Sequence, residues 1–140
     1  MTRRSRAREV ALQLLFQRDH NPHIERSVIE SFAHDRLREP AVEPFCLGLY
    51  DGVVNNLSAI DEKLATAAEN WRLSRMAGVD RNLLRMGAFE LMFCPDTPPS
   101  VALDQAIELA RRYGTADSPA FVNGILDRLL QDAVPPSKQE

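Results

Sequence analysis

The chain has 140 residues, of which 44% are hydrophobic, and its formal net charge is −3. This length suffices for one domain whose apolar core needs no disulfide or metal, and the hydrophobic content excludes intrinsic disorder. No apolar run reaches membrane-spanning length and no signal peptide opens the chain, so we expect a cytoplasmic protein without membrane association. The two cysteines, Cys46 and Cys94, stand apart among apolar residues, a setting typical of buried free thiols.

The first predicted helix, residues 2–18, carries a concentrated positive charge. Its five arginines, against the single acid Glu9, give it a charge of +4, whereas the rest of the chain carries −7. Thr2 is a good N-cap residue, so the first arginines lie at the positive end of the helix dipole, where a helix optimised for stability would carry acids. A basic patch on an acidic chain indicates nucleic-acid binding. The alternative is a solvated basic terminus in a chain that has fifteen arginines and two lysines.

The next two predicted helices are separated by Pro40. The first covers residues 24–38, and the apolar residues expected on its buried face are Ile24, Val28, Phe32 and Leu37. The longest periodic pattern in the chain then predicts one continuous helix over residues 43–69, with Pro44 in its first turn, where proline is tolerated.

Three more helices are predicted after an ordered connection at residues 71–78. They cover residues 79–93, residues 100–113 and the segment from Ser118 onward. The first of these is apolar on most sides and should be central, and Gly114 stands where a left-handed C-terminal cap would lie. The fold class is therefore predicted to be all-α, a compact bundle of about six to seven helices. We expect residues 1–134 to form a single domain and residues 135–140 a disordered tail.

The sequence shows no recognisable catalytic or cofactor-binding pattern. The glycine-rich and Walker phosphate loops are absent, and no serine or cysteine stands in a triad pattern with histidine. His20 and His23 are separated by Asn21 and Pro22, so no regular helix can present both to a metal ion. We therefore expect a protein that is not an enzyme and that binds no cofactor or metal.

Glycines within the helical patterns call for an explanation. Gly124 follows Asn123 in what should be a helix interior, where glycine costs about 1 kcal/mol relative to alanine. It indicates close approach of either another helix or a ligand. Gly48 and Gly52 have a spacing that permits close helix packing. Phe121, in the first turn of the same helix as Gly124, is either a core residue or a platform on which a base stacks.

Several segments, in the same order along nearly the whole chain, resemble the NusB family of bacterial transcription antitermination proteins. They are Arg4-Ser5-Arg6-Ala7-Arg8-Glu9, Ala11-Leu12-Gln13 with Leu15, Val79-Asp80-Arg81 with Leu84-Arg85, Ala106-Ile107-Glu108-Leu109-Ala110, and Asp117-Ser118 with Phe121-Val122-Asn123-Gly124-Ile125-Leu126-Asp127. The resemblance implies two three-helix halves packed together. It also implies binding of boxA-type RNA in ribosomal RNA leaders, together with the ribosomal protein NusE, within an antitermination complex on RNA polymerase.

The resemblance also implies which residues act. The predicted RNA-binding residues are Arg3, Arg4, Arg6, Arg8, Asp117, Ser118, Phe121 and Asn123. Phe16 and Asp80 match positions near the partner and RNA surfaces and are predicted to bind the partner. We expect the arginines to be exposed, so that Arg6→Ala or Arg8→Ala weakens RNA binding with little effect on folding. Ser5 departs from the family pattern, in which another arginine is frequent.

An RNA-independent function stays open at this point. The basic first helix could bind an acidic protein, which would make the chain a protein–protein scaffold. The resemblance allows both monomers and homodimers, and a homodimer could cover the basic helix.

Overall fold

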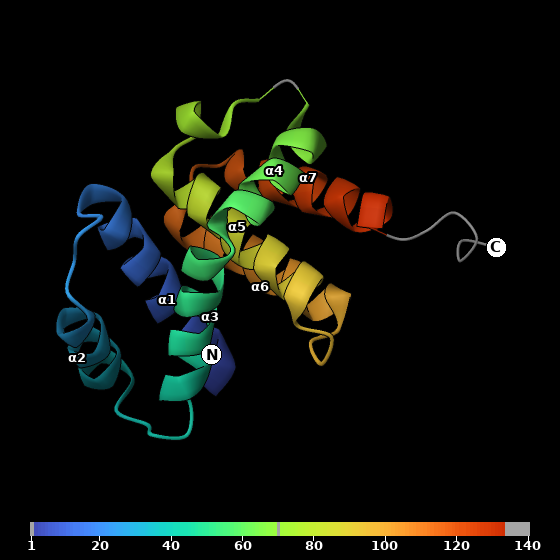
Figure 1. Cartoon of the computed structure of the whole chain (residues 1–140). Coiled ribbons are helices and arrows are strands. Elements are labelled where there is room, and N and C mark those ends of the chain that lie inside the picture. The colour runs from blue at the N-terminus through green and yellow to red at the C-terminus, as the bar shows by residue number, and fades with distance from the viewer. Residues whose placement is uncertain (1, 70, 134–140) are drawn as a thin grey trace. The chain divides into compact units, whose positions relative to one another are not determined.

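The computed structural model describes residues 2–69 and 71–133, and seven α-helices account for most of them (Figure 1). These helices are α1 (Arg3–His20), α2 (Arg26–Leu37), α3 (Glu43–Asn55), α4 (Leu57–Ala68), α5 (Gly78–Phe93), α6 (Pro99–Tyr113) and α7 (Ser118–Ala133). A short 3₁₀ helix, η1 (Leu73–Arg75), lies in the connection before α5, and the described residues contain no strand. The all-α prediction and the expected number of helices are confirmed. The predicted disordered tail lies outside the described residues.

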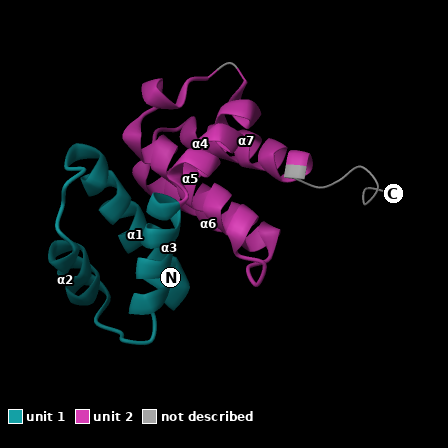
Figure 2. Ribbon diagram, in the orientation of Figure 1, with its two compact units in different colours: residues 1–55 teal, residues 56–140 magenta. Residues whose placement is uncertain are grey.

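The chain divides into two compact units, residues 1–55 and residues 56–140 (Figure 2). In unit 1, each of α1, α2 and α3 packs against the other two. The fully buried side chains at this packing include Val10, Leu14, Ile29 and Val53. Unit 1 therefore matches the three-helix half that the resemblance implies.

Unit 2 contains four α-helices, and α5 packs against α4, α6 and α7, as expected for a helix that is apolar on most sides. Gly87 allows α5 and α7 to approach closely, because a Cβ built at this position would lie 2.6 Å from the Leu126 Cδ1 atom. Arg85 on α5 forms two hydrogen bonds of 2.9 Å with the Asp61 carboxylate on α4. This largely buried ion pair gives Arg85 a structural role.

The prediction of one continuous helix over residues 43–69 is wrong. The helix ends at Asn55, and Asn56 has φ −117° and ψ 20° before α4 begins at Leu57. Asparagine side chains compete for backbone hydrogen bonds, which makes an Asn55-Asn56 pair a weak point in a helix. The apolar spacing continues across the break, since Val53, Ile60 and Leu64 are all buried. Periodicity alone therefore could not reveal it, and unit 2 gains a fourth helix.

Of the four apolar residues expected on the buried face of α2, Leu37 is buried, but Ile24, Val28 and Phe32 are not. The buried residues are Ile29, Ala33 and Leu37, whereas Val28 is 48% exposed. Phe32 instead lies under the Arg36 guanidinium, 4.7 Å from the ring centroid. The helix begins at Arg26, two residues later than predicted, so Ile24 belongs to the preceding loop.

Gly114 does not adopt the predicted left-handed conformation. Its φ is −94° and its ψ is −167°, which is extended backbone open to any residue. Glycine is required here for a different reason: a Cβ would lie 2.4 Å from the Ser118 Oγ and 2.8 Å from the Ala110 carbonyl oxygen. The corner between α6 and α7 is thus closed too tightly for a side chain at residue 114.

Candidate nucleic-acid interface

Unit 1 presents the predicted basic residues on the first two turns of α1. Thr2 caps this helix as expected, because its hydroxyl accepts a hydrogen bond of 3.1 Å from the Ser5 backbone N–H. The cap places Arg3, Arg4 and Arg6 on the first turn or just after it. No acid lies in that first turn, so the dipole there is left without a complementary charge.

Two of these arginines are paired with acids. Arg3 forms a largely exposed ion pair of 3.2 Å with Glu39, and Arg6 pairs with the buried Glu9 one turn along α1. The local charge of +4 therefore overstates the charge that is free to meet a polyanion. Glu39 lies beyond α2, and its proximity to Arg3 could not be read from the local sequence.

Arg4 and Arg8 both lie over the ring of Phe45 on α3. Their guanidinium carbons are 4.6 Å and 5.1 Å from the ring centroid, within the range of a cation–π interaction. Arg4 is exposed, but Arg8 is only 3% exposed. The expectation that all the arginines are exposed is thus wrong for Arg8. The cause is the tertiary contact with Phe45, so removing Arg8 must affect packing as well as charge.

In unit 2, residues from three segments line a hollow of about 200 Å³, here called the Asp117 hollow. Its lining residues are Trp71, Arg75, Met76, Asp80, Thr115, Asp117, Ser118 and Phe121. The structure thus brings together four residues that were predicted to act, although Asp80 had been assigned to the partner surface. That assignment stays a prediction. The Asp80 Oδ1 atom is buried and accepts no hydrogen bond from the described residues.

An aromatic pair forms part of this hollow. Phe121 is partly exposed, and its ring and that of Trp71 form a T-shaped pair with 5.3 Å between centroids and an interplanar angle of 83°. Trp71 is 60% exposed, the largest value among the large hydrophobic residues that the structure describes. Phe121 is therefore not a fully buried core residue, and the exposed Trp71 ring beside it is accessible to a stacking base.

Ser118 shapes the hollow from within. It is 1% exposed, and its Oγ accepts a hydrogen bond of 2.9 Å from the Thr115 backbone N–H. The hydroxyl is therefore engaged in fixing the corner between α6 and α7. Asp117, just before it, is exposed. We therefore expect Ser118 to position Asp117 and Phe121 rather than to meet a ligand itself.

Asn123 is not brought to the hollow. It is exposed but lies two residues beyond Phe121, which turns it about 200° around α7. Sequence reasoning conversely missed Trp71 and Arg75, which line the hollow from the connection before α5. Their only signal was a lone tryptophan in a segment without helical periodicity.

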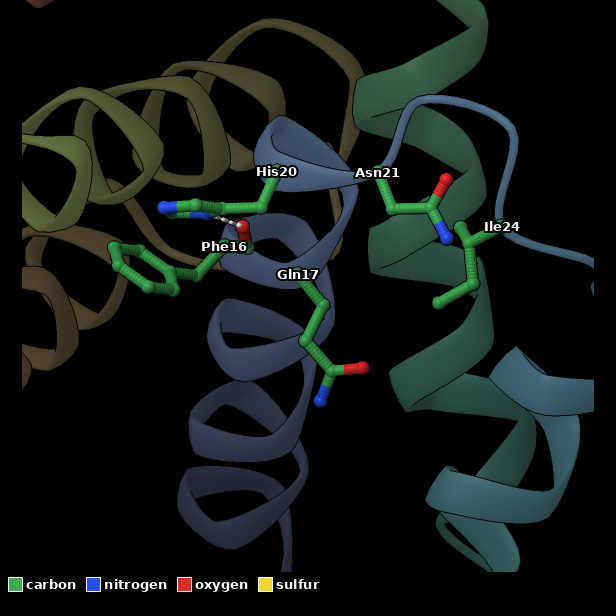
Figure 3. Close-up of a pocket in the computed structure, with 5 residues that line it drawn as sticks. All are labelled: Phe16, Gln17, His20, Asn21 and Ile24. Carbon is green, nitrogen blue, oxygen red and sulfur yellow. Dashed lines mark hydrogen bonds between the residues drawn. The ribbon is translucent and has the colours of Figure 1, made fainter.

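Phe16 lies at the opposite end of α1 from the arginine cluster. It is 39% exposed and lines a separate hollow of about 320 Å³ with Gln17, His20, Asn21 and Ile24 (Figure 3). The Phe16 and His20 rings lie side by side at 4.7 Å, and the His20 Nδ1 atom is 3.0 Å from the Phe16 carbonyl oxygen. This exposed aromatic pair is compatible with a partner surface, which stays a prediction.

Residues 2–69 and 71–133 show no metal site and no membrane-spanning helix, and the thiol of Cys46 is not activated. No group of three or more histidine, cysteine or acidic residues in these segments could hold a metal ion. No described helix is long and apolar enough to cross a membrane. Cys46 is a buried free thiol whose pKa is raised to about 12 by burial and, secondarily, by Glu43, so it is a poor nucleophile. Cys94 forms no disulfide and is partly exposed.

Known proteins resemble this chain over nearly its full length. The NusB family model matches residues 5–131. The transcription antitermination protein NusB of Sorangium cellulosum is 45% identical over 94% of both chains, and that of Pseudothermotoga lettingae is 37% identical over 99% of both. The structure of T. maritima NusB superimposes with a TM-score of 0.84 at 36% identity, covering 99% of this chain and 97% of that one.

A structure of antitermination factors NusB and NusE in complex with dsRNA has a TM-score of 0.85, covering 94% of this chain and 98% of that one. At 22% identity, this likeness supports the fold alone. The relatives are transcription antitermination proteins rather than enzymes. The family resemblance drawn from the sequence is confirmed: the chain belongs to the NusB family of transcription antitermination factors.

Proposed function

We propose that this chain binds boxA-type single-stranded RNA of ribosomal RNA leaders together with the ribosomal protein NusE. In this role it is a non-catalytic adaptor within the antitermination complex on RNA polymerase. The observation that carries the proposal is the Asp117 hollow, which brings the predicted residues Asp117 and Phe121 together with the exposed ring of Trp71. Accessible rings in a hollow are how proteins hold the unstacked bases of single-stranded RNA.

The arginines of α1 supply a second RNA contact. Arg3 and Arg4 are exposed, and the ion pair of Arg3 is a weak surface pair that a phosphate can replace. Only a few phosphate contacts can form there, so RNA binding by this chain alone should be modest. A basic ribosomal protein bound to this acidic chain would add positive charge, and the coupling between RNA and NusE must then be reciprocal. Phe16 is the residue that we assign to the partner surface.

The test is an anisotropy titration of a labelled boxA-type RNA and of a scrambled RNA of the same composition, with and without saturating NusE. We expect a preference for the boxA-type RNA, an affinity that falls with salt, and tighter RNA binding with NusE. Equal affinity for the two RNAs in the presence of NusE would contradict the RNA function. It would favour the rival function, a scaffold whose basic helix binds an acidic protein. Light scattering of the free chain distinguishes a monomer from a homodimer.

Glu39 offers a change that should strengthen RNA binding. Glu39→Gln removes the acid that pairs with Arg3, so we expect roughly a twofold or greater gain in RNA affinity and a salt slope that is steeper by up to about one. Stability should change by less than about 0.5 kcal/mol, because the pair is exposed.

The matched control is Glu30→Gln, which makes the same charge change but removes an acid that pairs with Arg26 at 3.5 Å on α2. If both variants gain RNA affinity equally, overall charge explains the effect and Arg3 has no special role.

A further inference from the structure

A second hollow in unit 2, of about 260 Å³, shares Trp71 and Phe121 with the Asp117 hollow but is otherwise lined by different residues. On α7 it is lined by Ala120, Gly124 and Arg128, which are spaced one helical turn apart and so follow one face. Glu69 lies at its edge and pairs with Arg128 at 3.4 Å. We call it the Gly124 hollow.

Gly124 has no packing role within the described chain. A Cβ built there meets no heavy atom within 4 Å, so the interpretation that another helix approaches it closely is wrong. A glycine in a helix interior lowers helix stability relative to alanine. The residue therefore carries a stability cost that no neighbouring helix explains, and it leaves the backbone of α7 open at the hollow.

The occupant that fits this surface is a nucleotide of single-stranded RNA. Trp71 offers an accessible indole on which a base can stack whatever its identity. Arg128 can meet a phosphate, because its pair with Glu69 is formed by side chains that are 48% and 63% exposed and is therefore weak. The Arg128 guanidinium is held in place by a hydrogen bond of 3.0 Å to the Ala67 carbonyl oxygen. The hollow also adjoins the proposed RNA site, with which it shares the lining residues Trp71 and Phe121.

We infer that the Gly124 hollow is a second nucleotide subsite, in which a base stacks on Trp71 and the RNA backbone passes over Gly124 toward Arg128. The inference rests on the proposed function. It extends the RNA contact from the Asp117 hollow to the neighbouring nucleotide. It also gives Gly124 a positioning role that packing does not supply.

The first test uses the intrinsic fluorescence of Trp71, the only tryptophan in the chain. Titration of the full chain with unlabelled boxA-type RNA should quench its emission, with the same midpoint as an anisotropy titration of labelled RNA. Unchanged tryptophan emission at saturating RNA would overturn the inference, because a base stacked on the indole cannot leave its emission untouched.

The second test is Gly124→Ala. Alanine should raise the melting temperature, since it favours the helix and meets open space. It should nevertheless weaken boxA-type RNA binding by about fivefold or more, because its methyl group fills the path of the RNA backbone. A structural defect cannot produce this combination of higher stability and lower affinity.

Gly48→Ala is the matched control. Gly48 is also an exposed glycine within a helix, and a Cβ built there meets no atom within 4 Å, but it lies on α3. It should raise the melting temperature and leave RNA affinity unchanged.

The outcomes separate this inference from the proposed function. If wild-type chain binds no RNA, with or without NusE, the proposed function fails. If wild-type chain binds boxA-type RNA and Gly124→Ala binds it equally well, only the subsite fails. If Gly124→Ala instead weakens NusE binding in the absence of RNA while RNA affinity holds, the hollow is a protein-docking surface and the inference is overturned.

Discussion

Replacing Gly114 by alanine is expected to destabilise the protein by about 2 kcal/mol and to weaken RNA binding at the same time. The new Cβ would lie 2.4 Å from the Ser118 Oγ and 2.8 Å from the Ala110 carbonyl oxygen. Ser118 is buried and accepts the Thr115 N–H, and the Ala110 oxygen belongs to the backbone of α6. Neither can move without shifting the corner between α6 and α7, which carries Asp117 and leads directly into Phe121.

The measurements are urea unfolding and RNA anisotropy on the same protein. Because φ at Gly114 is −94°, alanine can adopt the same backbone conformation without strain. Any loss of stability therefore comes from the crowding around the new Cβ alone. Gly48→Ala, which meets open space, serves again as the control and should be slightly stabilising. Wild-type stability in Gly114→Ala would show that the corner tolerates a side chain and that Ser118 does not hold it rigidly.

Local sequence signals predicted the elements of the fold well where side-chain chemistry acts within a few residues. Thr2 capped the first helix as expected, and the predicted ends of α5 and α6 agree with the structure to within a residue. The break at Asn56 could not be found in this way, because the apolar spacing on either side of it continues unchanged. Gly114 was expected to cap a helix through its φ angle, whereas the structure needs it for space, which only the position of Ser118 reveals.

The candidate interface was less predictable than the fold because its charges and rings are arranged by tertiary contacts. Glu39 meets Arg3 from the segment after α2, and Phe45 meets Arg4 and Arg8 from α3. Trp71 reaches Phe121 across fifty residues of sequence, from a connection with no periodic pattern. The residue types therefore indicated a basic surface with an aromatic residue. They could not show which arginines remain available for RNA, or that Phe121 is one of a pair of aromatic residues.

Arg8→Ala is expected to lower the free energy of unfolding by about 2–3 kcal/mol, whereas Arg4→Ala should change it by less than about 0.5 kcal/mol. Both guanidinium groups lie over the same ring of Phe45, but Arg8 is 3% exposed and Arg4 is exposed. A buried cation over an aromatic ring contributes more to stability than an exposed one does. Removing Arg8 also leaves empty the space that its packed aliphatic stem fills. The two arginines therefore form a matched pair that separates structural from RNA-binding contributions.

Urea unfolding and salt-dependent RNA titrations of the two variants would check this assignment. Arg4→Ala should keep the stability and lower the salt slope by about one, as the loss of one phosphate contact requires. Arg8→Ala should show its main effect in unfolding, and Phe45→Leu should reproduce part of that loss because it removes the ring while keeping an apolar side chain. If Arg8→Ala keeps wild-type stability but loses RNA affinity, Arg8 is foremost an RNA contact. Its burial against Phe45 would then serve to orient its charge rather than to hold α1 on α3.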